Sequence, residues 1–163
     1  MLVKQQREAN VGRASARQGV DDFGRPAALW SNSQSQSLSA EERGRRLLQV
    51  AAEGAVGELR ALIAAGADVG ARGGRGWTAL HWAADRGDVE AARLLVGAGA
   101  AVDARDSWGW TPLHYAAVNG RAEVAAALLV AGADRGATTG DGGQTALDIA
   151  REYNQRRLVE MLS

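Results

Sequence analysis

The sequence predicts an all-α protein with short β-hairpin turns, built as a solenoid of stacked helix-turn-helix units. One observation is a block of about 33 residues that recurs four times and fills the C-terminal three-quarters of the 163-residue chain. A second is that Thr78 and Thr111 lie 33 residues apart, as do His81 and His114. Such a period is typical of repeat units that bury their apolar faces against their neighbours and have no single closed core. We therefore expect an elongated surface that is suited to binding.

The chain divides into a leader, residues 1–41, and a repeat domain, residues 42–163. The leader runs into a low-complexity segment, residues 31–43, that is rich in Ser and Gln. Because so polar a segment cannot compensate for the entropy of ordering, we predict that the leader is disordered. Its basic, Ser-containing composition leaves an organelle transit peptide as an alternative. The four repeats are expected at about 42–73, 74–106, 107–139 and 140–163.

A first helix is expected near the start of each unit. In units two to four a threonine directly precedes the apolar run, and its hydroxyl can accept a free backbone N–H as an N-cap: Thr78, Thr111 and Thr145. Pro112 takes the first helical position of the third unit, where its missing N–H costs nothing. In the second unit Leu80, Ala83 and Ala84 then lie on one helical face.

Glycines are expected to end both helices of a unit. A glycine in the left-handed conformation should end the first helix, and Asn takes this position in the fourth unit: Gly54, Gly87, Gly120 and Asn154. A second helix should follow with an apolar inner face, for example Val89, Ala92 and Leu95. A later glycine ends it: Gly66, Gly99 and Gly132. The links between units are rich in turn-forming residues and favour hairpins.

The segments TALHWAA, from Thr78, and TPLHYAA, from Thr111, resemble the T-P-L-H-x-A-A signature of the ankyrin repeat family. The resemblance covers about Arg45 to Ser163. It implies L-shaped units of a hairpin and two antiparallel helices, whose concave side of hairpin tips and first helices usually binds other proteins. It also implies that His81 and His114 hydrogen-bond to backbone in the neighbouring hairpin. The first unit lacks the signature and the fourth has Asp148 in place of the histidine, as suits capping units that leave one face to water.

The residue types argue against catalysis. The chain has no Cys, which excludes disulfides, thiol nucleophiles and Cys-based zinc sites. Its two histidines share one repeat position, and the sequence contains no G-x-S-x-G elbow, Walker motif or dinucleotide-binding glycine motif. Carboxylates such as Asp103 and Asp106 follow the hairpins like turn residues, unlike a metal cage. We therefore predict a protein that is not an enzyme and that needs no cofactor and no metal.

The charge balance disfavours polyanionic partners. Nineteen basic residues balance nineteen acidic ones, so no net charge attracts the chain to nucleic acid or to an anionic membrane. No apolar stretch reaches the roughly 18–20 residues that a membrane span needs. We therefore expect a monomeric protein of the cytoplasm or nucleus that has no membrane contact.

Candidate contact residues follow from the variable positions that the resemblance implies. They include Trp and Arg, which often dominate interface energetics because they bury a large area and still offer a donor. The set comprises Arg72, Arg75, Trp77, Asp85, Arg86, Arg105, Ser107, Trp108, Trp110 and Asn119. For Trp77 and Trp110, packing between adjacent hairpins is an equal alternative. Trp108 is placed at an exposed hairpin tip, and this favours binding.

The sequence thus predicts a noncatalytic protein–protein interaction module that binds a protein partner on its concave hairpin and first-helix face. One alternative is a regulatory inhibitor that covers the cleft of an enzyme. Another is a nucleic-acid-binding protein that uses Arg72, Arg75, Arg86 and Arg105. Neighbouring acidic residues dilute the positive field there and disfavour this alternative.

Overall fold

The computed structural model describes residues 38–140 and 142–163, and the predicted leader lies almost entirely outside this part of the chain. Within the described residues the chain forms eight α-helices and one short 3-10 turn, Gly74–Gly76. The helices pair in chain order: α3 (Ala40–Glu53) with α4 (Val56–Ala64), α5 (Ala79–Arg86) with α6 (Val89–Gly97), α7 (Pro112–Val118) with α8 (Ala122–Val130), and α9 (Ala146–Glu152) with α10 (Arg156–Leu162). The predicted all-α solenoid of helix pairs is confirmed.

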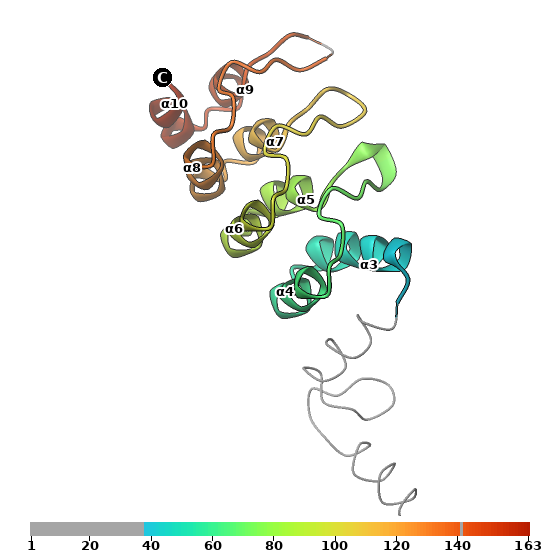
Figure 1. The fold of residues 1–163 in the computed structure, drawn as a ribbon. Coiled ribbons are helices and arrows are strands. Elements are labelled where there is room, and N and C mark those ends of the chain that lie inside the picture. The colour runs from blue at the N-terminus through green and yellow to red at the C-terminus, as the bar shows by residue number, and fades with distance from the viewer. Residues whose placement is uncertain (1–37, 141) are drawn as a thin grey trace, which may run out of the picture.

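The helix pairs are stacked in two rows (Figure 1). The first helices α3, α5, α7 and α9 form one row, the second helices form the other, and the links between units project beside the first row. Each inner first helix packs against the first helix before it and the one after it. Leu47, Leu80 and Leu113 are each buried at their own level of this stack. The apolar core is therefore a series of layers along the solenoid.

Capping boxes fix the start of each first helix. The Thr78 hydroxyl accepts from the backbone N–H of His81 at 3.4 Å, while His81 Nδ1 accepts from the Thr78 N–H at 3.0 Å. The third unit repeats this arrangement. In the fourth unit the carboxylate of Asp148 accepts the N–H of Thr145 at 3.0 Å. The cap is thus preserved where the histidine of the signature is missing, which confirms the predicted N-caps.

Helix α3 begins two residues before the expected start of the repeat domain. Its N-cap is Ser39, whose hydroxyl accepts from the Glu42 N–H at 3.1 Å, and Glu42 accepts the Ser39 N–H at 2.9 Å. This is the S-x-x-E capping box, a helix-start signal that lies within a segment whose composition alone indicates disorder. The same hydrogen bonds hold the pKa of the Glu42 carboxyl below its usual value.

The ends of the first helices follow the predicted pattern, but in the third and fourth units the left-handed residue comes one position after the cap residue, which is Tyr153 in the fourth unit. Gly54 and Gly87 cap α3 and α5 with φ of 77° and 79°, and Asn154 takes a φ of 57° in the fourth unit. In the third unit the cap residue is Asn119 with a φ of −96°, and the left-handed residue is Gly120, with a φ of 70°. These positive φ values explain the choice of Gly and Asn.

The links form turns with no β-strand in the described part of the chain. One backbone hydrogen bond closes each link, from Gly73 to Trp77, from Asp106 to Trp110 and from Thr139 to Gln144, each 2.9 Å long. Between the backbones of successive links there is one hydrogen bond each, from the Ser107 N–H to the Arg75 carbonyl at 2.9 Å and from the Gly140 N–H to the Trp108 carbonyl at 3.0 Å. Because isolated bonds do not make a ladder, the expected hairpins appear as turns stacked side by side.

Gly109 makes the closest approach between successive links. Its φ is +76°, and a Cβ built there would lie 2.6 Å from the backbone N of Gly140. Gly99 is a matched control, because its φ is +94° and a Cβ there would meet nothing within 4 Å. Gly109→Ala is expected to lower the free energy of unfolding by about 2–3 kcal/mol and Gly99→Ala by only about 1 kcal/mol, as measured by urea unfolding. Equal losses would show that the link contact contributes nothing.

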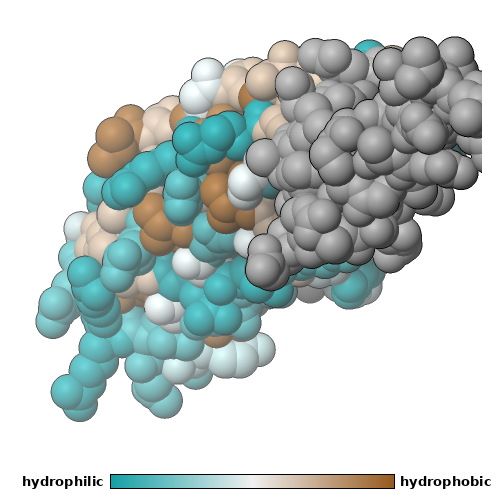
Figure 2. Space-filling model, turned by 90° about the horizontal axis from the view of Figure 1, so that it is seen from below, coloured by the Kyte–Doolittle hydropathy of each residue, from teal (hydrophilic) through white to brown (hydrophobic). Residues whose placement is uncertain are grey.

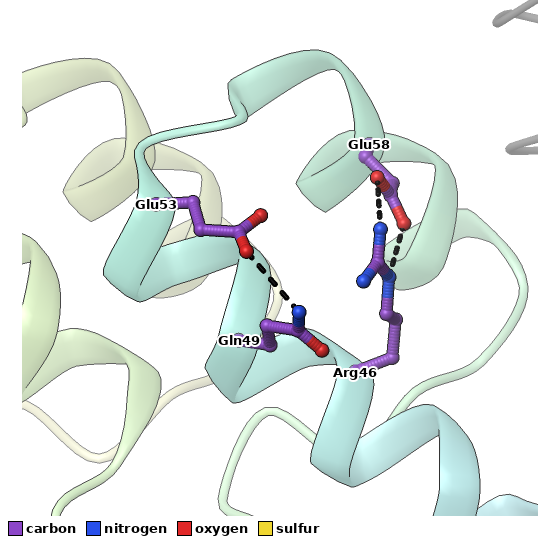
Figure 3. Close-up of polar contacts among 4 residues, drawn as sticks. All are labelled: Arg46, Gln49, Glu53 and Glu58. Carbon is purple, nitrogen blue, oxygen red and sulfur yellow. Dashed lines mark hydrogen bonds and ion pairs between the residues drawn. The ribbon is translucent and has the colours of Figure 1, made fainter. Parts of the chain in front are cut away.

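The first unit presents polar side chains at the start of the stack. Figure 2, viewed from this end, shows hydrophilic residues over much of the surface that is drawn in colour. Figure 3 shows Arg46 of α3 reaching Glu58 of α4 through two hydrogen bonds, of 2.5 and 2.8 Å, and Gln49 donating to Glu53 at 3.1 Å. The hydrogen bonds that Arg46 donates to the Glu58 carboxylate raise the pKa of Arg46. The Arg46–Glu58 pair links α3 and α4, while the bond between Gln49 and Glu53 lies within α3.

No helix in residues 38–140 and 142–163 combines the length and the apolar character required to span a bilayer.

Candidate protein-binding surface

The ten predicted contact residues fall into two groups. The link group lies in the two turns before α5 and α7 and comprises Arg72, Arg75, Trp77, Arg105, Ser107, Trp108 and Trp110. The helix-end group lies at the C-terminal ends of α5 and α7 and comprises Asp85, Arg86 and Asn119. Helix α5 has eight residues, so the two groups are separated by about 12 Å along its axis. We call the surface formed by the links and the first helices the loop face.

Four aromatic side chains pack together beneath the links. The ring of Trp77 lies 4.7 Å from that of Trp82 and 4.6 Å from that of Tyr115, between centroids. Tyr115 in turn lies 5.0 Å from Trp110. These four residues, called the aromatic cluster below, join the second and third units through ring contacts. Trp77 is only 5% exposed, which favours the packing alternative for this residue.

Asp106 is the polar centre of the aromatic cluster. One carboxylate oxygen accepts from Trp77 Nε1 at 3.1 Å and from the Tyr115 hydroxyl, and the other accepts from the backbone N–H groups of Trp108 and Trp110, each at 2.9 Å. The residue is 7% exposed. Burial raises the pKa of this carboxyl, but the hydrogen bonds outweigh burial and hold the pKa below its usual value. Burial and the Asp106 carboxylate raise the pKa of the Tyr115 hydroxyl.

Sequence reasoning treated Asp106 as an ordinary turn residue. The matching position of the second unit is Gly73, so the repeat itself gives no sign of this role. The sequence could have indicated only one of these hydrogen bonds, because an Asp at the start of a turn can accept from the backbone N–H two residues later. No spacing rule would have predicted that the indole of Trp77, in the preceding unit, donates to the same carboxylate.

The two histidines have the structural role that the family resemblance implied. His81 Nε2 lies 3.0 Å from the carbonyl oxygen of Trp110, and His114 Nε2 lies 3.0 Å from that of Ala137, so each imidazole reaches the following link. Both side chains are buried, and burial lowers the pKa of each imidazole. In the part of the chain that the structure describes, no group of three or more His, Cys, Asp or Glu side chains could hold a metal ion.

Arg72 and Arg105 brace the links. The Arg72 guanidinium donates to the carbonyl of Gly76 at 2.8 Å and to that of Arg105 at 2.6 Å. Arg105 repeats the arrangement one unit later, with the carbonyls of Gly109 at 2.9 Å and Thr138 at 2.5 Å. Both side chains remain exposed. Because all four acceptors are neutral carbonyls, these bonds leave both positive charges uncompensated.

Trp108 is the exposed aromatic residue of the link group. It is 53% exposed. The guanidinium carbon of Arg75 lies 5.7 Å from the Trp108 ring centroid and 5.1 Å from that of Trp77, both within cation–π range. Arg75 therefore connects the buried indole of the aromatic cluster with the indole at the tip. Ser107, beside Trp108, is also exposed.

The helix-end group connects successive units. Asn119 donates to the Asp85 carboxylate at 2.8 Å, and Arg86 donates to the carbonyl of Ala52 at 3.0 Å. Arg121 adds a bond to the carbonyl of Asp85 at 3.2 Å. These residues are partly or fully exposed, but their hydrogen-bonding groups are engaged within the protein.

A separate apolar hollow lies on the row of second helices. It has a volume of about 360 Å³ and is lined by residues of α6 and α8, with Val96, Ala127 and Val130 among them. Val130 is 90% exposed. None of the ten predicted contact residues lines this hollow.

Comparison with known families supports the repeat assignment. A family model described as ankyrin repeats (3 copies) matches residues 47–139 and 99–163. Together these ranges reach all four helix pairs and both groups of contact residues. No curated protein matches the chain.

Proposed function

Since the chain belongs to the ankyrin repeat family, we propose that its repeat domain, residues 42–163, is a noncatalytic module that binds one protein partner through the loop face. Ankyrin repeats are generally protein–protein interaction modules. The binding face and its residues are specific to this chain and are argued from the geometry of the links.

The single observation that supports this face most strongly is the exposed indole of Trp108 on an ordered turn. The ring is 53% exposed, while the backbone beneath it is held by the Asp106 carboxylate and by the Gly140 N–H. A large aromatic side chain on a braced turn buries much area on binding and loses little conformational freedom. Arg75, which contacts the same ring, adds the second residue type that dominates interfaces.

We expect Trp108→Ala to weaken partner binding by about 1–3 kcal/mol while leaving the melting temperature nearly unchanged. The full-length chain would first capture its partner from cell extract, and calorimetry would then give the affinity of each variant for the identified protein. Val130→Ala is the control, since Val130 is also an exposed apolar residue, at 90%, but lies on α8 in the row of second helices. An unchanged affinity for Trp108→Ala, with a lowered melting temperature, would assign Trp108 to packing.

The identity of the captured partner decides between two modes of action. If the partner is an enzyme and loses activity when it is bound, the module acts as a regulatory inhibitor. If its activity is unaffected, the module acts as an adaptor.

A further inference from the structure

We propose that the segment recognised at the two links is an acidic peptide, with a Glu or Asp carboxylate bound by the guanidinium of Arg75 beside the indole of Trp108. This inference rests on the proposed function and narrows the chemistry of the partner. It depends on three features of the links: the positive φ of Arg75, the unused N–H groups of its guanidinium, and the positive charge balance of the two turns.

Arg75 is held in a conformation that its residue type disfavours. Its φ is 62° at the centre of the Gly74–Gly76 turn, a region that Gly and Asn populate far more readily than Arg. Its carbonyl accepts the N–H of Ser107 from the next link, which fixes the turn. Residues kept in such conformations are found disproportionately at ligand-binding positions. The strained turn places an Arg where local folding alone would favour Gly or Asn.

The guanidinium of Arg75 lies over two indole rings and has N–H groups that no described residue accepts. Its central carbon is 5.1 Å from the ring centroid of Trp77 and 5.7 Å from that of Trp108. No hydrogen bond or ion pair within the described residues uses its N–H groups. An Arg edge of this kind matches a carboxylate through two parallel N–H···O bonds. Because Arg75 already occupies the aromatic faces, a cation on the partner would be repelled, and an anion fits the site.

Within the two turns themselves, the balance of charge is positive, like that of Arg75. The two turns, residues 72–77 and 105–110, contain three basic residues, Arg72, Arg75 and Arg105, and one acidic residue, Asp106. The carboxylate of Asp106 is buried and accepts four hydrogen bonds, so it is not available to a partner. Three positive charges minus one negative charge leave a surplus of two positive charges on these turns.

The positive strip is too short to favour nucleic acid. The next link, residues 138–144, contains no basic residue, so the strip ends after two turns. Affinity for nucleic acid grows with the number of phosphates that basic side chains neutralise, and a chain of zero net charge adds no general attraction. A short peptide with two or three carboxylates matches the extent of the strip.

Fluorescence polarisation with the full-length chain tests the inference. The probes are labelled peptides of equal length that alternate Ser with Glu, Gln or Lys, and an oligothymidine with the same charge as the Glu peptide. The Glu peptide should bind roughly tenfold or more tightly than the Gln peptide, since charge-assisted bidentate bonds are the stronger ones. The Lys peptide should not bind measurably. Equal affinity for the Glu and Gln peptides would overturn the inference, and tighter binding of oligothymidine would transfer the site to nucleic acid.

Variants of exposed arginines test whether Arg75 is the residue that binds the Glu peptide. Arg75→Gln should reduce binding of the Glu peptide to the level of the Gln peptide, and Arg75→Lys should restore it only in part because Lys cannot form the planar pair. Arg93→Gln is the control, since Arg93 is exposed and lies on α6 beside the apolar hollow. Arg75→Asn separates loss of binding from loss of folding, because Asn tolerates the positive φ at this position. This variant should keep the wild-type melting temperature and should not bind the Glu peptide. Unchanged binding by Arg75→Gln would contradict the inference.

The two proposals can fail separately. Acidic peptides could fail to bind while Trp108→Ala still weakens binding of the protein partner. In that case the loop face binds proteins by other chemistry, and only the inference of an acidic peptide is wrong. If Arg75 binds acidic peptides but Trp108→Ala retains the protein partner, the proposed contact surface fails while the carboxylate site stands.

Discussion

Replacing Asp106 by Ala should lower the free energy of unfolding by about 3–5 kcal/mol. Its carboxylate accepts from two backbone N–H groups, the Trp77 indole and the Tyr115 hydroxyl. Leaving a buried donor without an acceptor costs roughly 1–3 kcal/mol, and water entering the site would recover part of the sum. The loss should therefore exceed that of any single hydrogen bond on the surface of the stack.

Urea unfolding followed by circular dichroism measures this loss. Asp103→Ala is the matched control, because Asp103 is exposed and accepts one hydrogen bond, from the Asp134 N–H at 3.0 Å, so its loss should stay within about 1 kcal/mol. Tyr115→Phe removes one donor from the Asp106 carboxylate and should cost about 1–2 kcal/mol. If Asp106→Ala and Asp103→Ala lose similar, small amounts of unfolding free energy, the Asp106 carboxylate does not stabilise the aromatic cluster.

The protein should become less stable as the pH falls below about 6.5. Burial lowers the pKa of His81 and His114 from the model-compound value of 6.5. In the unfolded chain both values return to about 6.5, so below that pH the unfolded state binds more protons than the folded state. Stability therefore rises with pH in this window and is lost on acidification, by at most about 2.7 kcal/mol per pH unit for the two histidines together. The loss from these groups ends once the pH is below their folded pKa values.

Unfolding free energies measured at pH 7.5, 6.5 and 5.5 would show this dependence. The double variant His81→Gln and His114→Gln keeps a residue that can close each capping box but does not titrate, so its slope should be much smaller. The lowered pKa of Asp106 affects a separate range, since its contribution is present above its unfolded value near 3.8 and is lost only at lower pH. A wild-type protein that is equally stable at pH 7.5 and 5.5 would contradict the assignment of neutral, buried imidazoles.

The fold could be predicted from sequence because its determinants are local and repeated. In the second and third units a threonine, the first residues of an apolar face and a glycine set the first helix, and the structure places Thr78 and Gly87 at the two ends of α5 as expected. The start of α3 was missed because the capping box of Ser39 and Glu42 lies in a segment of disordered composition. The composition of a segment is an average over many residues, whereas a capping box depends on only two of them, here Ser39 and Glu42.

The site could be predicted only in part. Sequence reasoning found the tip position of Trp108 and its exposure, because the residue lies in the turn-forming link between two units. It could not separate Arg75, whose N–H edge is open, from Arg72, whose guanidinium donates to two carbonyls. That difference depends on contacts between successive links, and these contacts are set by the stacking of units.

In the proposed function, the links divide stabilising and binding roles between neighbouring residues. Asp106, the histidines and Arg72 hold each link to the next, while Trp108 and Arg75 present their free groups above this frame. Substitutions of the first set should lower stability, and substitutions of the second should lower affinity.

Amide hydrogen exchange of the full-length chain, with and without its captured partner, tests the location of the binding surface most directly. The loop face predicts that new protection appears in residues 72–77 and 105–110. New protection confined to α6 and α8, around the apolar hollow, would show that the partner binds the row of second helices and would contradict the proposal.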